Sequence, residues 1–417
     1  MIDCNNFYCS CENLFKPSIA TKPIIVLSNN DGCAISRNEK AKQLGIQMAQ
    51  PAFMIGSLIN EKEVQVFSSN YALYGDISER VMQIIKEFVP RTEIYSIDEI
   101  FADLSDLNYH DPEKIAVEIR STVRQCTGIP VSIGIGPTKT LAKMANRYAK
   151  KHCADKGVFI ADNNRVITEL LSSTDVGDIW GIGGQHKNFL YRNGFKNAWQ
   201  LRNAPEEWVR KNMSVVGQRL LNELKGICSI EWEEIKPKRI NITTSRSFGK
   251  LISNKKEIKE AIAKFTSSCG EKLRKEKSCA GKMNVFIQTN PHRPEDLQYF
   301  QSITLQLPVP SNLTTELIKY SMRALELIYQ PGYLYQKAGV IVTDLVPAEK
   351  HQLGLFDKEN RSKIKKLMEK LDEVNHIFGR DTVRMAVQDY GSNWKLKQET
   401  LSPSYTTNIN QLPKAKA

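Results

Sequence analysis

The stretch YSIDEIF at residues 95–101 decides the fold, because two adjacent carboxylates, Asp98 and Glu99, interrupt an otherwise strand-like run. Apolar and aromatic residues on both sides predict a β-hairpin whose bend holds the two carboxylates at one edge of a sheet. Taken alone, an acidic dipeptide of this kind is more often a polar hairpin turn. Its meaning therefore depends on the residues that accompany it.

A third carboxylate, Asp3, lies in the first candidate strand, and only two residues precede it. The predicted strand is therefore very short. Hard cations take oxygen ligands, and one carboxylate can bridge two ions, so three carboxylates at a strand edge suit a pair of Mg²⁺ ions. Asp3, Asp98 and Glu99 together predict phosphoryl or nucleotidyl transfer.

The chain has 417 residues and a formal net charge of +12, and its sequence pI is near 9.1. This length predicts about two to four domains. A basic excess of this size indicates a polyanionic partner, and because no apolar run approaches membrane-spanning length, nucleic acid is favoured over a bilayer. No secretory signal begins the sequence, so we expect a cytoplasmic protein without a membrane partner.

The nine cysteines are odd in number and scattered, which favours reduced thiols over a disulfide framework. Cys9 and Cys11 are too close in sequence for a zinc knuckle, and Cys153 has no second ligand pair nearby. The few histidines are isolated, so a Cys/His nucleophilic pair is not indicated.

The first part of the chain predicts a small hairpin and a basic helix. Residues 24–27 form a strand candidate, and the turn signal at 29–32 leads into the next strand. Ser36 is expected to cap a helix that carries Arg37, Lys40 and Lys42 and ends at Gly45. These bases could face phosphate, although a solvated helix face is the commoner meaning of such a pattern.

The next elements alternate between strands and helices. A strand at 64–67 and an apolar helical stripe at 77–88 precede the acidic hairpin, and a helix at 115–123 and a strand at 131–135 follow it. This order predicts a ferredoxin-like sheet with helices on one face.

A basic helix follows that sheet. Thr138 is expected to cap it, and Lys139, Lys143, Arg147 and Lys150 recur at intervals that place them along one helical face. Such a stripe beside an acidic site would suit a triphosphate or a nucleic acid backbone.

Residues 180–184, WGIGG, open a segment in which we expect two short helices ending near residues 225–226. Glycines at a tight turn before a helix leave backbone N–H groups free to bind a phosphate, as in helix-hairpin-helix elements. A simple turn between helices is nearly as good an interpretation of this motif alone.

Beyond the basic linker KPKR at 236–239, the pattern restarts as a second βαββαβ unit, over residues 238–347. Its first strand, expected near 240–248, carries hydroxyl and basic side chains that suit a duplex backbone. They are Arg239, Thr243, Thr244, Ser245, Arg246 and Lys250.

The C-terminal part contains the short apolar motif QLGLF at 352–356, an amphipathic helix at 364–377 and a polar end. Exposed Leu and Phe at such spacing often bind a groove of a partner, although a contact with the parent domain is a fair alternative. From about residue 398 onward we expect a flexible segment.

Over nearly the whole chain, these motifs resemble Y-family DNA polymerases, and most closely their UmuC branch. The sequences that carry the resemblance are DCNNFY at 3–8 with Glu12, NNDGC at 29–33, SIDE at 96–99, SIGI at 132–135 with Lys139, LAK at 141–143, IWGIG at 179–183 and QLGLF at 352–356.

The resemblance implies an error-prone translesion DNA polymerase of the SOS response. It further implies that Asp3, Asp98 and Glu99 ligate two Mg²⁺ ions together with the backbone carbonyl of Cys4. Tyr8 matches the steric-gate position, where its ring would exclude a ribose 2′-hydroxyl, and Phe7 would pack behind it.

Contacts to substrates are implied in the same way. The residues matching triphosphate-binding positions are Arg37, Lys42 and Lys150. The bases of the finger helix depart from the commoner family pattern, because Glu39 and Lys42 stand where many members use tyrosine and arginine. The residues expected to contact the DNA backbone are Lys139, Lys143, Gly181, Gly183, Arg239, Thr244 and Arg246.

The implied fold class is a multidomain α+β right-hand polymerase with a ferredoxin-like palm, small fingers, a helical thumb and a βαββαβ little finger. The expected boundaries are the palm at 1–12 and 67–165, the fingers at 13–66, a helix-hairpin-helix-like thumb at 166–232, a linker at 233–237, the little finger at 238–347 and a partner-binding tail at 348–417.

The implied partners are primer-template DNA, deoxynucleoside triphosphates, a sliding clamp, a UmuD-type dimer and RecA. The clamp would bind Gln352, Leu353, Leu355 and Phe356. Two alternatives stay open: another palm-type nucleotidyl transferase, such as a nucleotide cyclase, and a DNA-binding repair scaffold with impaired catalysis.

Overall fold

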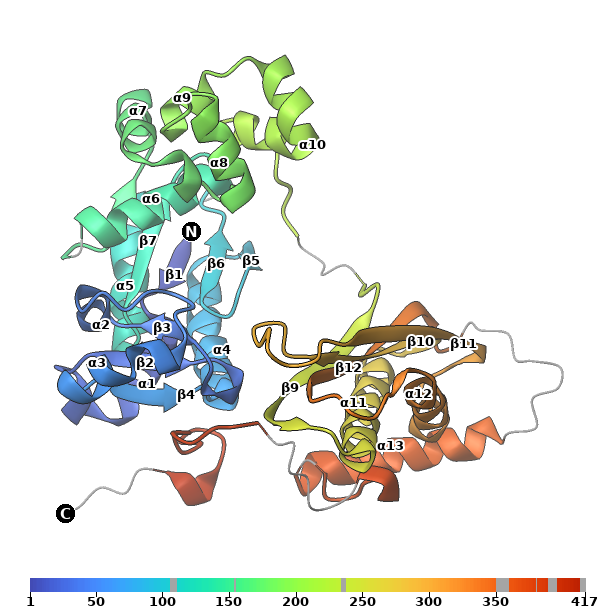
Figure 1. Ribbon diagram of the computed structural model, residues 1–417. Helices are drawn as coiled ribbons and strands as arrows, with labels where there is room; N and C mark the ends of the chain where they lie inside the picture. The colour runs from blue at the N-terminus through green and yellow to red at the C-terminus, as the bar shows by residue number, and fades with distance from the viewer. Residues whose placement is uncertain are drawn as a thin grey trace. The chain divides into compact units, whose positions relative to one another are not determined.

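The computed structural model describes residues 1–105, 111–153, 155–233, 238–349, 360–379, 381–388 and 396–412 (Figure 1). The chain divides into two compact units. The first comprises Met1–Ser28, Gly32–Lys236 and Thr400–Ala417, and the second comprises Asn29–Asp31 and Pro237–Glu399. Within the described ranges, no helix is both long and apolar enough to cross a bilayer.

A five-stranded sheet forms the centre of the first unit, in the order β5-β6-β1-β7-β8. Its strands are β1 (Ile2–Cys4), β5 (Thr92–Ile94), β6 (Glu99–Ala102), β7 (Val131–Ile135) and β8 (Val158–Ile160). The short strand β1 pairs antiparallel with both β6 and β7, so it is held on both sides. With α4 (Tyr71–Phe88) and α5 (Pro112–Thr127), this sheet confirms the predicted ferredoxin-like fold.

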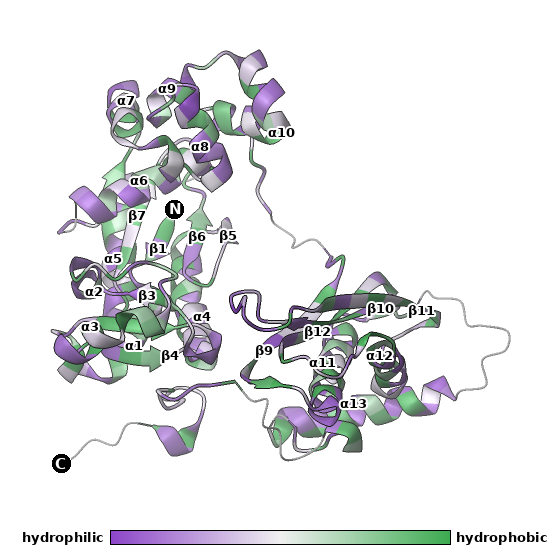
Figure 2. Cartoon of the chain, viewed as in Figure 1, coloured by the Kyte–Doolittle hydropathy of each residue, from purple (hydrophilic) through white to green (hydrophobic). Residues whose placement is uncertain are grey.

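The two faces of this sheet bury different partners. Ile2, Ile100 and Ile133 pack with the apolar stripes of α4 and α5 in one core. The central strands are hydrophobic in Figure 2. Alternate residues point to opposite faces, and Gly134 lies against α6 (Lys139–His152) so closely that a Cβ would stand 2.0 Å from the backbone nitrogen of Asn146. Gly134 therefore permits the contact between α6 and the sheet.

A smaller three-stranded sheet, ordered β3-β2-β4, follows helix α1 (Phe7–Phe15). It contains β2 (Ile24–Leu27), β3 (Ala34–Arg37) and β4 (Gln65–Ser68), with α2 (Glu39–Gln43) and α3 (Gly56–Glu61) nearby in sequence. The expected cap at Ser36 is wrong. Ser36 lies in β3, and the side chain of Asn38 accepts from the amide of Ala41 to begin α2.

The segment after the sheet contains four helices in the described ranges, three of them between residues 180 and 226, where two are predicted. They are α7 (Asn164–Ser173), α8 (Gly184–Arg192), α9 (Ala198–Arg202) and α10 (Glu206–Leu224). Ser214 interrupts α10 with a φ of 63°, which breaks its apolar periodicity. Single turns of 3-10 helix occur at Pro17–Ile19, Asn29–Asp31, Ala52–Ile55, Val176–Asp178, Ala386–Gln388 and Ile409–Gln411.

The second unit contains a four-stranded antiparallel sheet in the order β11-β10-β12-β9. Its elements follow the predicted βαββαβ order: β9 (Ile242–Ile252), α11 (Lys255–Lys275), β10 (Ser278–Thr289), β11 (Phe300–Ser311), α12 (Thr314–Ile328) and β12 (Tyr335–Pro347). Both helices pack against one face, where alternate residues of the strands are buried. The other face of the sheet is mostly polar but also carries Phe286, Phe300 and Ile341.

Helix α13 (Arg361–Ile377) confirms the amphipathic helix predicted at 364–377. Two forked ion pairs attach it to the second unit: Arg274 with Asp372, at 2.6 and 2.8 Å, and Arg361 with Glu316, at 2.9 and 3.1 Å. Residues 400–405, in the segment predicted to be flexible, instead pack against the rest of the first unit, beginning with a bridge between Leu401 and Ser68. Polar composition did not reveal this docking, because hydrogen bonds hold much of the segment.

Candidate active site

The three predicted carboxylates meet where β1 and β6 run side by side. Asp3 is paired directly with Glu99 across the two strands. Residues opposite one another in an antiparallel pair have side chains on the same face. Asp98 immediately precedes β6, and the amide of Cys4 donates to its carbonyl at 2.9 Å. The hairpin and the first strand therefore bring Asp3, Asp98 and Glu99 together, with the Cys4 backbone beside them.

Two lysines of α6 neutralise part of this charge. Lys150 forms an ion pair with Asp3, and Lys143 lies 2.9 Å from Glu99. Burial raises the pKa of Asp3 to about 6; Lys150 opposes the rise, and the charges of Glu99 and Asp98 add to it. The carboxylates thus repel one another in a site whose negative charge is only partly balanced.

The donor set has the oxygen chemistry that a hard divalent cation requires, although the side chains point to other partners. All three side chains offer oxygen ligands, and their mutual repulsion would be relieved by added positive charge. Within the part of the chain that the structure describes, no group of three His, Cys, Asp or Glu side chains is arranged to hold a metal ion. Asp3 and Glu99 are directed to lysines, and Asp98 accepts from the Ser96 hydroxyl at 2.6 Å.

Tyr8 lies in the first turn of α1, which begins after Asn6 in a left-handed conformation. Its ring stacks on Tyr74 with centroids 4.4 Å apart and meets Tyr71 edge-on at 6.0 Å. Burial raises the pKa of Tyr8 to about 12, and Tyr71 and Asp98 also contribute to the rise. Phe7 is buried in the core beside it, with ring centroids 5.8 Å apart.

Tyr71 and Tyr74 are residues that the sequence analysis missed. They lie one turn apart at the start of α4, before the apolar stripe that predicted this helix. The aromatic residues directly after the capping residue Asn70 were the available signal.

The predicted triphosphate-binding bases lie in different settings. Arg37 is in β3, not in the helix, and donates to the carbonyl of Ile46. Lys42 pairs with Glu39 at 2.6 Å. Lys150 is the one of the three that the structure places against the acidic cluster.

Lys139 does not lie where a DNA-backbone contact requires it. The residue is 7% exposed, and its ammonium group donates to Glu93 and to the carbonyl of Glu231, both at 2.6 Å. The ring of Trp232 lies 4.9 Å away. The predicted DNA contact is therefore corrected. Lys139 is an interior tie, that is, a buried side chain that joins Glu93 to the carbonyl of Glu231, because the chain that leaves α10 covers this face of α6.

Lys143 occupies an aromatic setting. Its ammonium group lies 4.4 Å from the ring centre of Tyr95 and 5.3 Å from that of Trp180. The Trp180 indole donates to the Tyr95 hydroxyl at 3.1 Å. Lys143 therefore links the acidic hairpin to the start of the glycine motif, a contact that sequence spacing could not show.

The two glycines of that motif differ in their backbone. Gly181 has a φ of +91°, which favours glycine, whereas Gly183 has a φ of −82° and precedes α8 as its capping residue. No side chain caps α8. The first amides of the helix are therefore not satisfied by a capping side chain.

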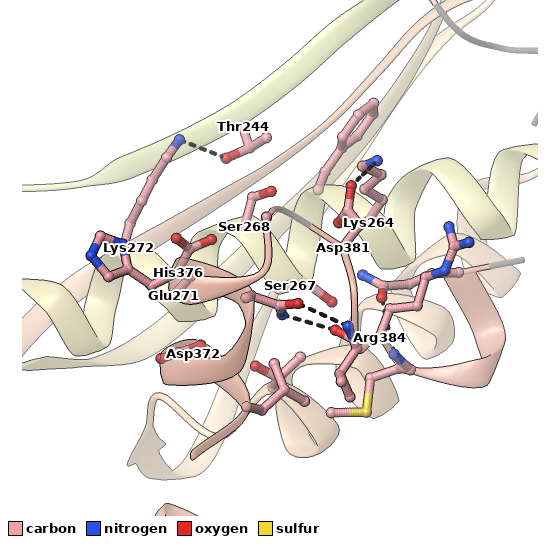
Figure 3. A pocket seen from close by; sticks show the side chains of 18 of the residues that line it. Thr244, Lys264, Ser267, Ser268, Glu271, Lys272, Asp372, His376, Asp381 and Arg384 are labelled. Atoms are coloured by element: carbon pink, nitrogen blue, oxygen red, sulfur yellow. Dashed lines mark hydrogen bonds and ion pairs between the residues drawn. The ribbon is translucent and has the colours of Figure 1, made fainter. Parts of the chain in front are cut away.

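Thr244 lies on the helix-covered face of the sheet, where its side chain is not open to a duplex. It is buried beneath α11, and its hydroxyl accepts from Lys272 at 3.0 Å (Figure 3). Arg246 shares this side and lines the same cavity of about 670 Å³, while Arg239 pairs with Glu276 at 2.8 Å. Opposite charges such as Lys264 and Asp381 pair within the cavity, so its lining is not uniformly basic.

The opposite face of this sheet carries most of the hydroxyl, amide and basic side chains, interspersed with Phe286, Phe300 and Ile341. The strand registers place the following residues on it: Thr243, Ser245, Ser247, Lys282, Asn284, Ser302, Thr304, Gln306, Lys337 and Thr343. The predicted motif residues Gln352, Leu353, Leu355 and Phe356 lie outside the described residues.

A ferredoxin-like sheet that presents three carboxylates beside a half-buried tyrosine, followed by a helical segment and a second α+β unit, defines a right-hand polymerase. The family profile described as the impB/mucB/samB family matches residues 2–147, and the profile of its C-terminal domain matches residues 239–355. A domain of unknown function matches residues 365–415. The chain belongs to the impB/mucB/samB family.

Relatives and solved structures agree with this assignment. The chain is 39% identical to Protein ImpB of Salmonella typhimurium, over 100% of this chain and 99% of that protein. It is also 39% identical to Protein UmuC of Salmonella typhimurium strain LT2, with the same coverage. A Y-family DNA polymerase chimera of Dbh and Dpo4 has a similar fold, with a TM-score of 0.62 and 16% identity over 83% of this chain and 98% of the other.

The predicted family, fold class and enzyme class are therefore confirmed. The protein is a DNA-directed DNA polymerase of the Y family and of the translesion class, in the branch that contains UmuC. The nucleotide-cyclase alternative is wrong. Y-family polymerases generally depend on a divalent metal.

Proposed function

We propose that the protein adds deoxynucleotides to a primer 3′ end opposite damaged template bases during the SOS response, with Asp3, Asp98 and Glu99 as ligands of two Mg²⁺ ions and the Cys4 carbonyl as a backbone ligand. The observation that carries this proposal is the direct pairing of Asp3 with Glu99 beside Asp98. Bound Mg²⁺ would supply Lewis-acid chemistry at the primer hydroxyl and the triphosphate.

The residues of the chain would then orient the reactants. Lys150 and Lys143 form ion pairs with Asp3 and Glu99, and Lys150 lowers the pKa of Asp3 against the effect of burial. Lys150 is the base best placed to meet a triphosphate, with Arg37 and Lys42 in supporting positions. The carboxylates would hold the site for the reacting oxygens, and the lysines would limit their mutual repulsion.

Tyr8 would act as the steric gate. Its ring is held between Tyr74, Tyr71 and Phe7, so it has little freedom to move away from a sugar. A ribose 2′-hydroxyl would collide with such a ring, whereas a deoxyribose would not. Asp98 influences the pKa of Tyr8, which supports a location of the gate beside the carboxylates.

The proposed domains keep the boundaries predicted from the sequence. The palm comprises 1–12 and 67–165, the fingers 13–66, the thumb 166–232, the linker 233–237, the little finger 238–347 and the tail 348–417. Gly181 and Gly183 would hold a DNA backbone through backbone amides at the start of α8 and just before it. In the little finger, we assign duplex contacts to the polar sheet face that includes Lys282 and Lys337, in place of Thr244 and Arg246.

The further partners rest on sequence alone. Gln352, Leu353, Leu355 and Phe356 would bind a sliding clamp, and the tail would receive a UmuD-type dimer, with RecA as activator in the cytoplasm. Deleting residues 352–356 should reduce clamp-stimulated synthesis only. A loss of basal extension would contradict the clamp assignment.

Primer extension on undamaged and abasic templates, with and without these partners, tests the catalytic proposal. Asp98→Ala should abolish extension while the dissociation constant for primer-template DNA changes by less than about threefold. Asp76→Ala is the matched control, because its exposed ion pair with Arg80 contributes little. Extension by Asp98→Ala at the wild-type rate would refute the metal-ligand assignment, and no extension by the assembled wild-type complex would favour the scaffold alternative.

Tyr8→Ala tests the gate. The variant should incorporate ribonucleotides much more readily, because the ring that fills the space beneath the sugar is gone. The measurement is the ratio of kcat/KM for a deoxynucleotide to that for the matching ribonucleotide. An unchanged ratio would refute the assignment of Tyr8.

A further inference from the structure

A C-terminal segment, residues 400–405, is attached to the start of α4. The amide of Ser68 donates to the carbonyl of Thr400 at 3.1 Å, and the amide of Thr400 donates to the Ser68 hydroxyl at 3.1 Å. Leu401 forms a parallel bridge with Ser68. The segment thus continues the hydrogen bonding of β4 just before the helix that carries Tyr71 and Tyr74.

Asn70 connects the segment to the cap of α4. Its side-chain oxygen accepts from the amide of Leu73 at 3.2 Å and so caps the helix. Its side-chain nitrogen donates to the carbonyl and the hydroxyl of Ser402, at 3.1 and 3.0 Å, and to the carbonyl of Pro403 at 3.3 Å. One residue therefore fixes both the helix terminus and the docked segment.

A second connection runs through a buried carboxylate. One oxygen of Glu12 accepts from the Ser402 hydroxyl at 3.0 Å and from the Tyr74 hydroxyl at 2.6 Å. Glu12 is 1% exposed, and its other oxygen has no hydrogen-bond partner within the described ranges. Tyr405 also stacks on Phe15 of α1, with centroids 4.6 Å apart. The segment thus contacts α1, which carries Tyr8, and α4, which carries Tyr74.

We propose that Ser402 is a positioning residue for sugar selection, which braces Tyr8 through Glu12 and Tyr74. The proposal rests on the proposed role of Tyr8 as the gate. It gives a function to a part of the chain that lies within a domain of unknown function, at residues 365–415. The Tyr74 ring stacks on the Tyr8 ring. The hydrogen bond to Glu12 and the capped start of α4 hold Tyr74 in this orientation.

The expected effect concerns selectivity more than rate. A gate excludes by contact, and a small shift of the Tyr8 ring opens space for a hydroxyl. Ser402 makes no hydrogen bond to Asp3, Asp98 or Glu99 and no contact with the Tyr8 ring in the described structure, so its loss should leave deoxynucleotide incorporation nearly unchanged. The ratio of deoxynucleotide to ribonucleotide kcat/KM does not depend on the folded fraction, which separates positioning from a general loss of stability.

The test uses full-length variants in primer extension. Ser402→Ala removes the donor to Glu12, while Asn70 keeps the carbonyls of Ser402 and Pro403 as acceptors. The variant should therefore lower this ratio by about two- to fivefold, the effect of losing one net hydrogen bond. Ser402→Thr keeps a hydroxyl and should restore the wild-type ratio. Ser404→Ala is the matched control, because the Ser404 hydroxyl makes no hydrogen bond in the described segment, and it should leave the ratio unchanged.

A mutant cycle tests the route. Tyr74→Phe removes the other donor to Glu12 and keeps the ring, so it should lower the ratio by a similar factor. Combined with Ser402→Ala, it should lower the ratio by less than the product of the two single effects, because both substitutions interrupt one network. Independent, multiplying effects would overturn the route through Glu12.

Tyr8→Ala separates the gate role of Tyr8 from the positioning role of Ser402. A wild-type ratio in Ser402→Ala together with a lowered ratio in Tyr8→Ala would overturn the brace and leave the gate intact. An unchanged ratio in Tyr8→Ala would overturn the gate and the brace together. A lowered ratio in Ser402→Ala that Ser402→Thr restores supports the proposal.

Discussion

Replacing Lys139 with methionine removes a buried ammonium group and keeps most of the side-chain volume. The sequence predicts Lys139 as a DNA-backbone contact, whereas the structure makes it an interior tie between Glu93 on β5 and the carbonyl of Glu231. These two roles predict opposite results in two measurements. Lys139→Met therefore decides between them.

The magnitude follows from the burial of the pair. The Lys139 and Glu93 side chains are 6% and 11% exposed. Removing one partner of a buried ion pair costs about 3–5 kcal/mol in the free energy of unfolding. Glu93 keeps a hydrogen bond from the amide of Glu233 at 2.8 Å, which favours the lower end, about 3 kcal/mol. The melting temperature should fall by about 6–12 °C.

Thermal unfolding and the salt dependence of DNA binding are the two assays. As an interior tie, Lys139 contributes no released counterion, so Lys139→Met should keep the wild-type slope of log K against log salt concentration. Lys282→Met, on the polar face of the second sheet, should reduce that slope by about 0.9. Lys139→Met combined with Glu93→Gln removes both charges and should recover at least half of the lost stability.

The opposite pattern would refute the interior tie. A slope reduced by about 0.9 in Lys139→Met, with the melting temperature unchanged, would show that the ammonium group meets phosphate. It would also restore the role predicted from the sequence.

Two further predictions concern a glycine turn and an ion pair. Gly181→Ala should weaken primer-template binding by about fivefold in fluorescence anisotropy, because alanine is strained at a φ of +91°. The control Gly183→Ala, at a φ of −82°, should change the dissociation constant by less than about twofold. Equal effects of the two variants would contradict the backbone argument. Asp372→Asn should lower the free energy of unfolding in urea by about 2–3 kcal/mol, because its partner Arg274 is only 9% exposed. The control Asp381→Asn, in the more exposed pair with Lys264, should lower it by less than about 0.5 kcal/mol. Equal losses would show that Arg274 does not hold α13.

The sequence predicts the two βαββαβ patterns and the carboxylates because both depend on local signals. Apolar periodicity marks each strand and helix, and the hairpin places Asp98 and Glu99 without any distant information. Asp3 is predicted from its own short strand, although its place beside Glu99 depends on the pairing of that strand with β6. Local patterns of this kind are sufficient for the acidic part of the site.

The errors arise where a position depends on a distant segment or on the phase of a strand. Thr244 and Thr243 have similar chemistry, and a shift of one residue decides which of them faces α11. Lys139 is the first residue of a regular basic stripe on α6. In the part of the chain that the structure describes, Glu93 and the chain after α10 bind Lys139 and not the other residues of the stripe. Neither fact is present in the spacing of the residues themselves.

The docking of residues 400–405 is the strongest case of such dependence, because Ser402 and Glu12 are 390 positions apart. Several of its contacts are hydrogen bonds from a polar segment, so composition predicted flexibility. Yet a buried carboxylate that receives two hydroxyl donors is geometrically specific in a way that apolar contacts are not. Placing such a group behind Tyr74 makes the alignment of the proposed gate depend on the C-terminal segment, and sugar selectivity should change when that segment changes although every residue around the sugar stays the same.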